Sequence, residues 1–127
     1  MSVFLVALGG ALGALARWGI NLGFGDRPAT GFPWATSLIN VSGCFVIGLF
    51  LTLSAGRLRL DPAWTLLVAT GFCGAFTTFS TFAYETQMLM ASGAWPRALL
   101  YVLVSNGLGF LAVLAGVWLA KAGYSSP

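Results

Sequence analysis

Four long apolar stretches divide the chain, and they constrain its fold more than any other feature. Each is long enough for a helix to cross a hydrocarbon layer of about 30 Å, which takes roughly 20 residues. Only 7% of the 127 residues are charged and 58% are hydrophobic, too little polar surface to enclose a soluble core. The sequence therefore predicts an all-α membrane protein with one domain, residues 1–127, and four transmembrane helices near residues 3–24, 33–55, 64–91 and 96–120.

The third stretch carries an unusual polar segment at residues 71–82, GFCGAFTTFSTF. Its two glycines and four hydroxyl side chains weaken the i to i−4 hydrogen bonds of a helix. Backbone carbonyls freed inside a membrane are tolerated only where protein, water or an ion satisfies them. We therefore predict that the third helix is broken near its middle and that the break has a function.

Basic residues are divided almost evenly between the two ends of the predicted bundle. With both termini on one side, the two sides would carry Arg57, Arg59 and Lys121 against Arg27, Arg97 and Arg17. Because Lys and Arg in short loops set membrane orientation, a near tie predicts that copies insert both ways round. Opposite insertion permits an antiparallel homodimer, although so few charges could also tie by accident. The net charge of +3 includes no basic run typical of nucleic-acid binding.

Enzyme chemistry has little support in this sequence. It has no histidine, and its only carboxylates, Asp26, Asp61 and Glu85, form no acid/base pair by spacing. Glu85 is expected to be a helix-end carboxylate paired with an arginine, although an acid within a membrane span always raises a functional question. Cys44 and Cys73 lie in different spans, without the spacing of a redox pair or a zinc site, and are expected to be small packing residues.

Uncharged polar residues recur on three of the four predicted helices. Thr36 and Asn40 lie on the second, residues 77–81 on the third, and Tyr101 and Ser105 on the fourth. Such a track could conduct a small ion. The same groups could instead hold helices together, each contributing about 0.6 kcal/mol. For Asn40 and Ser105 both interpretations stay open at this point.

Two phenylalanines flank Ser80 and Thr81 in the polar segment. Phe79 and Phe82 are three residues apart and so share a helix face. Most such rings pack in a core or face lipid. An aromatic ring also has a positive edge, so two edges turned inward would favour a small anion without holding it tightly. Weak binding of this kind suits a conducting pathway.

Three segments resemble the Fluc family of fluoride channels, also called CrcB proteins. They are GGALGALAR at residues 9–17, NVSGCF at residues 40–45 and GFCGAFTTFSTF at residues 71–82. The resemblance runs along nearly the whole chain, and it, rather than the composition, points to fluoride. It implies a dual-topology homodimer with two antiparallel pores in the plasma (inner) membrane, exporting fluoride by passive electrodiffusion and so lowering cytoplasmic fluoride.

The resemblance also implies roles for individual residues. Phe79 and Phe82 would be the pore phenylalanines, Asn40 would offer its amide donor to fluoride, and Tyr101, Ser105, Thr81 and Thr36 would line the path. Backbone carbonyls of Gly74 and Thr77, from both subunits, would hold a structural sodium ion, a hard cation that takes oxygen ligands. Arg17 would make the aqueous vestibule electropositive. Gly109 departs from the family members that carry a serine there, so the polar track is expected to be shorter.

Two other functions remain as alternatives. Small multidrug-type exporters also form antiparallel dimers of four-helix subunits, but they need a glutamate early in the first span, and residues 3–24 contain none. A non-conducting structural subunit of a larger membrane complex would use the same small residues for packing alone.

Overall fold

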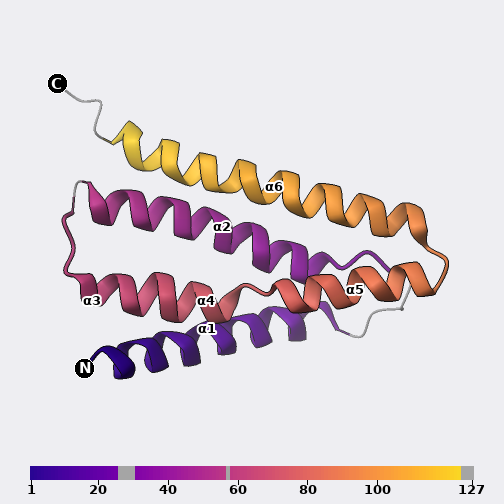
Figure 1. The fold of residues 1–127 in the computed structure, drawn as a ribbon, viewed down its shortest axis with the longest axis horizontal. Coiled ribbons are helices and arrows are strands. Elements are labelled where there is room, and N and C mark those ends of the chain that lie inside the picture. Colours follow the sequence, from indigo (N-terminus) through magenta and orange to yellow (C-terminus); the bar gives the residue numbers. More distant parts are fainter. Residues whose placement is uncertain (26–30, 57, 124–127) are drawn as a thin grey trace.

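The computed structural model describes residues 1–25, 31–56 and 58–123, and its helices fall into four membrane-spanning segments (Figure 1). These segments are Ser2–Phe24, Trp34–Ala55, Pro62–Ala91 and Trp95–Ala122. The four predicted spans are confirmed, with ends that differ by one or two residues. The elements in chain order are α1 (Ser2–Phe24), α2 (Trp34–Ala55), α3 (Pro62–Thr65), the π-helix η1 (Leu66–Cys73), α4 (Gly74–Phe76), α5 (Phe79–Ala91) and α6 (Trp95–Ala122).

Glycines set how closely the helices approach. α1 packs mainly on η1, and a Cβ at Gly9 or Gly13 would lie only 2.1 Å from the Leu67 carbonyl oxygen or 2.2 Å from that of Phe72. α2 packs mainly on α6, where a Cβ at Gly48 or Gly116 would lie 2.6 Å or 2.5 Å from a carbonyl oxygen of the opposing helix. In lipid, where apolar burial does not drive helices together, such close packing supplies much of the attraction.

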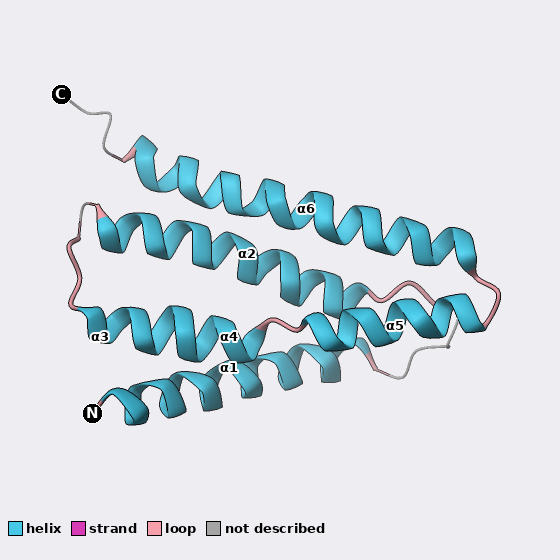
Figure 2. Cartoon of the chain, viewed as in Figure 1, coloured by secondary structure: helices cyan, strands magenta, loops and turns pink. Residues whose placement is uncertain are grey.

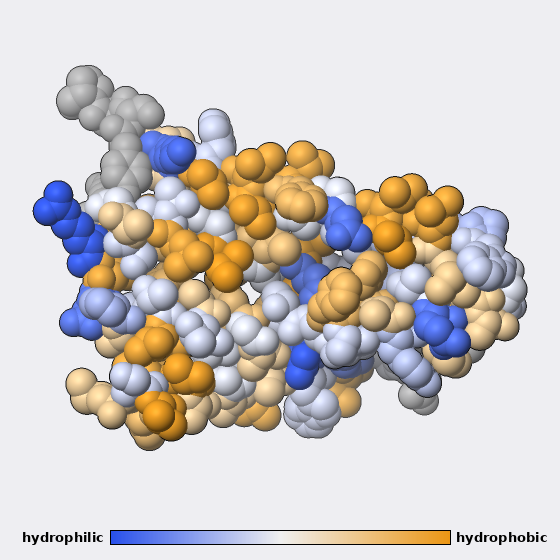
Figure 3. Space-filling view, viewed as in Figure 1, coloured by the Kyte–Doolittle hydropathy of each residue, from blue (hydrophilic) through white to orange (hydrophobic). Residues whose placement is uncertain are grey.

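The outer surface is apolar, as a lipid-facing surface must be. Large apolar side chains are exposed along α1 and α6, among them Trp18, Leu103, Phe110 and Trp118. In Figure 3 apolar side chains form several patches on the face in view, and hydrophilic groups lie at the end where α1 begins and α6 ends, near the middle and towards the opposite end. The described residues thus form a bundle that presents apolar side chains outward along its length.

The start of α1 and the end of α6 lie at the same end of the bundle (Figure 1). Lys121 is in the last turn of α6 at that end, and Arg97 is in the first turn of the same helix at the other. Arg59 follows α2 at the end that carries Lys121. The predicted positions of Arg27 and Arg57 lie outside the described residues.

The predicted break in the third span is confirmed. Thr77 and Thr78 have extended backbone angles, with φ −76° and ψ 157° at Thr77 and φ −151° and ψ 113° at Thr78. Figure 2 shows them as a loop between α4 and α5. The π-helical winding of η1, just before the break, also departs from the regular α-helical ladder. The chain therefore crosses the membrane with non-helical backbone at mid-span.

Candidate functional site

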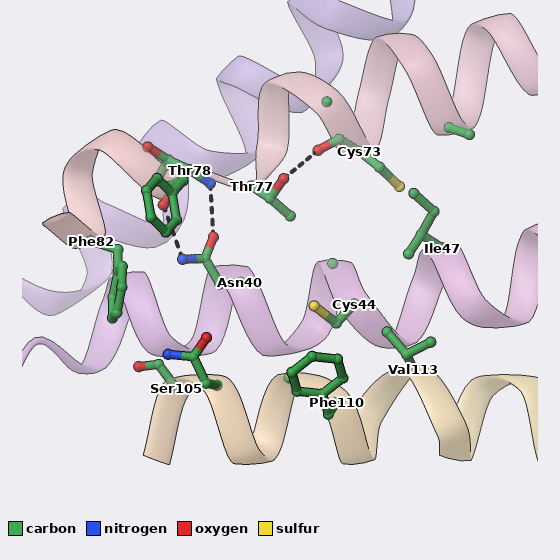
Figure 4. A pocket seen from close by; sticks show the side chains of 16 residues that line it. Asn40, Cys44, Ile47, Cys73, Thr77, Thr78, Phe82, Ser105, Phe110 and Val113 are labelled. Carbon is green, nitrogen blue, oxygen red and sulfur yellow. Dashed lines mark hydrogen bonds between the residues drawn. The ribbon is translucent and has the colours of Figure 1, made fainter. Parts of the chain in front are cut away.

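The amide of Asn40 bridges the break in the third span. Its Nδ2 donates to the Thr78 carbonyl at 3.0 Å, and its Oδ1 accepts from the Thr78 backbone N–H at 2.8 Å. Figure 4 shows the amide of α2 facing this peptide. Each Asn amide carries two N–H donors, so this pairing uses one of them. Asn40 is thus a structural partner of the break as well as a candidate anion ligand.

Two carbonyls on the break have lost their ordinary helical donors. In a continuous helix the N–H of residue i+4 would donate to the carbonyl of residue i. The Thr78 N–H, which would reach Gly74, donates to Asn40 instead, and the Thr81 N–H, which would reach Thr77, donates to the Thr78 hydroxyl at 3.2 Å. Among the described residues no backbone donor crosses the break to either carbonyl. These are the two residues predicted to bind sodium, and their oxygens suit a hard cation.

Thr78 also caps the helix that follows the break. Its hydroxyl accepts from the N–H of Thr81 and lies 2.9 Å from the Thr81 hydroxyl, to which it donates. A side-chain oxygen at this position satisfies one of the orphan donors of a helix N-terminus. α5 therefore restarts at Phe79 in a fixed position, and the first turn of α5 carries Phe79, Thr81 and Phe82.

The two phenylalanine rings meet but have different surroundings. Their centroids lie 5.7 Å apart with the planes tilted by 45°. Phe82 is 9% exposed and also contacts the ring of Tyr101 at 4.9 Å, whereas Phe79 is 78% exposed. The predicted shared face is confirmed. One ring is fixed inside the subunit, and the other projects from it.

Glu85 is a polar centre that the sequence interpretation did not place in the site. Its two carboxylate oxygens accept from the Thr36 hydroxyl at 2.9 Å and from the Tyr101 hydroxyl at 2.7 Å. Thr36 and Tyr101 are 1% and 0% exposed, so both hydroxyls are buried. Glu85 lies in the middle of α5 rather than at its end, and its pairing with an arginine stays a prediction. The sequence feature that could have predicted this cluster is a carboxylate inside an apolar span.

Ser105, on α6, contacts a residue of α2. Its hydroxyl lies 3.4 Å from that of Ser37, which joins α6 to α2. Ser42, by contrast, donates to the Leu38 and Ile39 carbonyls of its own helix. Ser37 and Ser42 therefore make the helix-stabilising contacts expected of such residues in membranes.

A cavity of about 470 Å³ lies between α2, the broken third span and α6 (Figure 4). Its lining includes six of the predicted site residues: Asn40, Gly74, Thr77, Phe79, Phe82 and Ser105. Thr36, Tyr101, Thr81 and Arg17 do not line it. Cys44, Cys73 and Gly109 do, and a Cβ at Gly109 would lie 3.5 Å from the Cys44 sulfur. The cavity joins the amide, the break and the two rings in one space.

Arg17, the predicted vestibule residue, lies outside the cavity. Arg17 is half-buried on α1, and its carbonyl accepts from the Asn21 amide at 2.9 Å. Across residues 1–25, 31–56 and 58–123, no group of three or more His, Cys, Asp and Glu side chains comes together to hold a metal.

Comparison with known proteins identifies the family. The family model described as CrcB-like protein, Camphor Resistance (CrcB), matches residues 4–117. The chain belongs to the CrcB family. A relative from Acidobacterium capsulatum, named fluoride-specific ion channel FluC, is 50% identical over 117 residues, 92% of this chain and 94% of the relative.

Further CrcB relatives carry the same name. The protein from Koribacter versatilis is 44% identical over 92% of this chain and 93% of its own length. The protein from a Roseiflexus species is 41% identical over 95% of this chain and 98% of its own length. The similarity thus covers all four spans, and the family to which the chain is assigned is one of ion channels rather than enzymes.

Proposed function

We propose that this CrcB-family chain is a fluoride-selective channel that exports fluoride passively through the membrane. The observation that carries the proposal is the cavity, which brings the Asn40 amide, the Ser105 hydroxyl and the Phe79 and Phe82 rings into one space at the helix break. Fluoride is small and strongly hydrated, so it needs close N–H and O–H donors to replace its water. The names of the relatives support the choice of fluoride.

The ring geometry supports a pathway completed by a second copy. Phe82 is fixed by its own subunit, but Phe79 is 78% exposed at the edge of the same cavity. In an antiparallel homodimer, rings from both copies would border each of two pores and present their positive edges to the anion. The nearly even division of basic residues supports insertion in both orientations.

The freed carbonyls support a structural sodium ion at the dimer interface. Gly74 and Thr77 fit this role because both of their ordinary helical donors are used elsewhere. When bound, sodium would supply a fixed positive charge and satisfy carbonyls that lipid cannot. A location in the plasma (inner) membrane, with Arg17 at an electropositive vestibule, completes the proposal.

Polar residues beyond the cavity would extend the path. Thr81 lies in the first turn of α5, next to the break. The hydroxyls of Thr36 and Tyr101 both donate to Glu85, further along α5. An exporter of the small multidrug type would need an acid in the first span, and α1 has none. No observation favours that alternative.

Fluoride efflux from liposomes containing the purified protein tests the proposal, with chloride as the comparison ion and Phe79→Ile beside the parent. We expect rapid loss of fluoride, negligible loss of chloride and a silent Phe79→Ile variant. A folded parent that passes no fluoride would overturn the proposal and favour a structural subunit. Phe79→Ile flux equal to that of the parent would remove that ring from the pore.

A further inference from the structure

We infer that Thr78 is a positioning residue which keeps the Thr77 carbonyl available to a cation and, through Asn40, links the cation site to the anion path. The inference rests on the proposed function, because the cation and the anion path are parts of it. Thr78 is 8% exposed and stands between the two halves of the third span. Its backbone and its side chain each make a different connection.

The backbone of Thr78 connects the break to α2. Both its N–H and its C=O are held by the Asn40 amide, at 2.8 Å and 3.0 Å. This pairing keeps the Thr78 N–H away from the Gly74 carbonyl, four residues earlier, which would be its acceptor in a continuous helix. The same amide faces the cavity. Any shift of the Thr78 peptide therefore moves a candidate anion ligand.

The side chain of Thr78 keeps a helical donor away from the other carbonyl, that of Thr77. Its hydroxyl accepts from the Thr81 N–H at 3.2 Å, and that N–H would otherwise be the helical donor to Thr77. The hydroxyl also donates to the Thr81 hydroxyl at 2.9 Å. Removing this oxygen would leave the Thr81 N–H without an acceptor. The donor would then compete with a cation for the Thr77 carbonyl.

A direct consequence is that Thr78 would position both the cation site and the Phe79 ring. Phe79 follows Thr78 in the chain and begins α5, so the capped turn sets the position of the ring. A cation on the Thr77 carbonyl would favour the extended conformation at the break. That conformation in turn keeps Asn40 and Phe79 where they line the cavity.

Sodium-dependent melting of the purified protein tests this inference without measuring transport. Melting temperature is followed in detergent as sodium chloride replaces choline chloride, because a ligand that binds only the folded state raises it. We expect Thr78→Ser to match the parent. Thr78→Val keeps the shape without the hydroxyl and should need about fivefold more sodium for the same stabilisation, the change that corresponds to one hydrogen bond.

A matched control is Ser42→Ala, since the Ser42 hydroxyl bonds only to carbonyls of its own helix. It should leave the sodium dependence unchanged. A general loss of packing in Thr78→Val would lower the melting temperature equally at every sodium concentration. That uniform drop would overturn the inference, as would a parent that shows no sodium dependence while passing fluoride.

A second variant covers failure of Thr78→Val to fold. Thr78→Cys offers only a weak sulfur acceptor and should need more sodium than Thr78→Ser. Equal sodium dependence in the two would overturn the inference. A parent stabilised by sodium that passes no fluoride would contradict the proposed function alone, so the two failures are distinguishable.

Discussion

Gly43→Ala is the substitution with the clearest structural consequence at the break. A Cβ at Gly43 would lie 2.2 Å from the Cγ2 methyl of Thr77, and ordinary contact begins at 3.4 Å. The methyl would therefore have to withdraw by about 1.2 Å, the difference between these two distances. Rotation of the side chain does not relieve the clash freely, because the Thr77 hydroxyl donates to the Cys73 carbonyl at 2.8 Å.

The magnitude follows from the two ways to relieve this clash. Rotating Thr77 sacrifices a hydrogen bond with a net contribution of about 1 kcal/mol. Moving the backbone instead carries an overpacking cost of about 1–3 kcal/mol. At about 1.4 kcal/mol per tenfold, either route depletes the native geometry of the break by roughly 5- to 150-fold. We expect fluoride flux to fall by at least about fivefold.

Fluoride efflux from liposomes at matched protein content measures this effect. Gly10→Ala is the control, because no heavy atom lies within 4 Å of a Cβ at Gly10. We expect the control to conduct like the parent. Parental flux through a folded Gly43→Ala variant would refute the reasoning, since it would mean that the position of Thr77 does not govern conduction.

Three further predictions concern other parts of the site. Asn40→Asp should abolish fluoride flux, because it replaces an N–H donor with a negative charge at the anion path; liposome efflux measures it. Cys44→Ala combined with Cys73→Ala should leave flux intact in the same assay, because both thiols are expected only to pack. Tyr101→Phe should lower the melting temperature, because Glu85 loses a hydrogen bond worth about 1.5–3 kcal/mol when the acceptor is charged.

Each of these predictions has a contradicting result. Unchanged flux in Asn40→Asp would remove the amide from the path. Loss of flux from a folded cysteine double variant would give the thiols a role beyond packing. An unaltered melting temperature in Tyr101→Phe would mean that its hydrogen bond to Glu85 adds nothing to stability.

Most of the fold could be predicted from the length of the apolar stretches and from residues that are neighbours in the chain. Span ends could be placed within two residues because apolar length is set by the bilayer. The break at Thr77 and Thr78 was predictable because glycines and hydroxyls act on their own neighbours in the chain. The shared face of Phe79 and Phe82 followed from helical spacing alone.

Contacts between distant segments could not be predicted in the same way. Glu85 meets Thr36 across 49 residues of sequence and Tyr101 across 16, so spacing within one helix says nothing of the cluster. The double hydrogen bond between Asn40 and Thr78 spans 38 residues and likewise requires the packed bundle. Periodicity showed which face each residue occupies, but not which partner it meets.

The most direct test of the central claim is the reversal potential of single channels in a planar bilayer with fluoride on both sides and chloride as the competing ion. A passive fluoride channel should reverse at the fluoride equilibrium potential, which shifts by about 59 mV for each tenfold fluoride gradient. Its reversal potential should not change when a chloride gradient is imposed. A reversal potential that follows chloride, or the absence of any current from folded protein, would contradict the account.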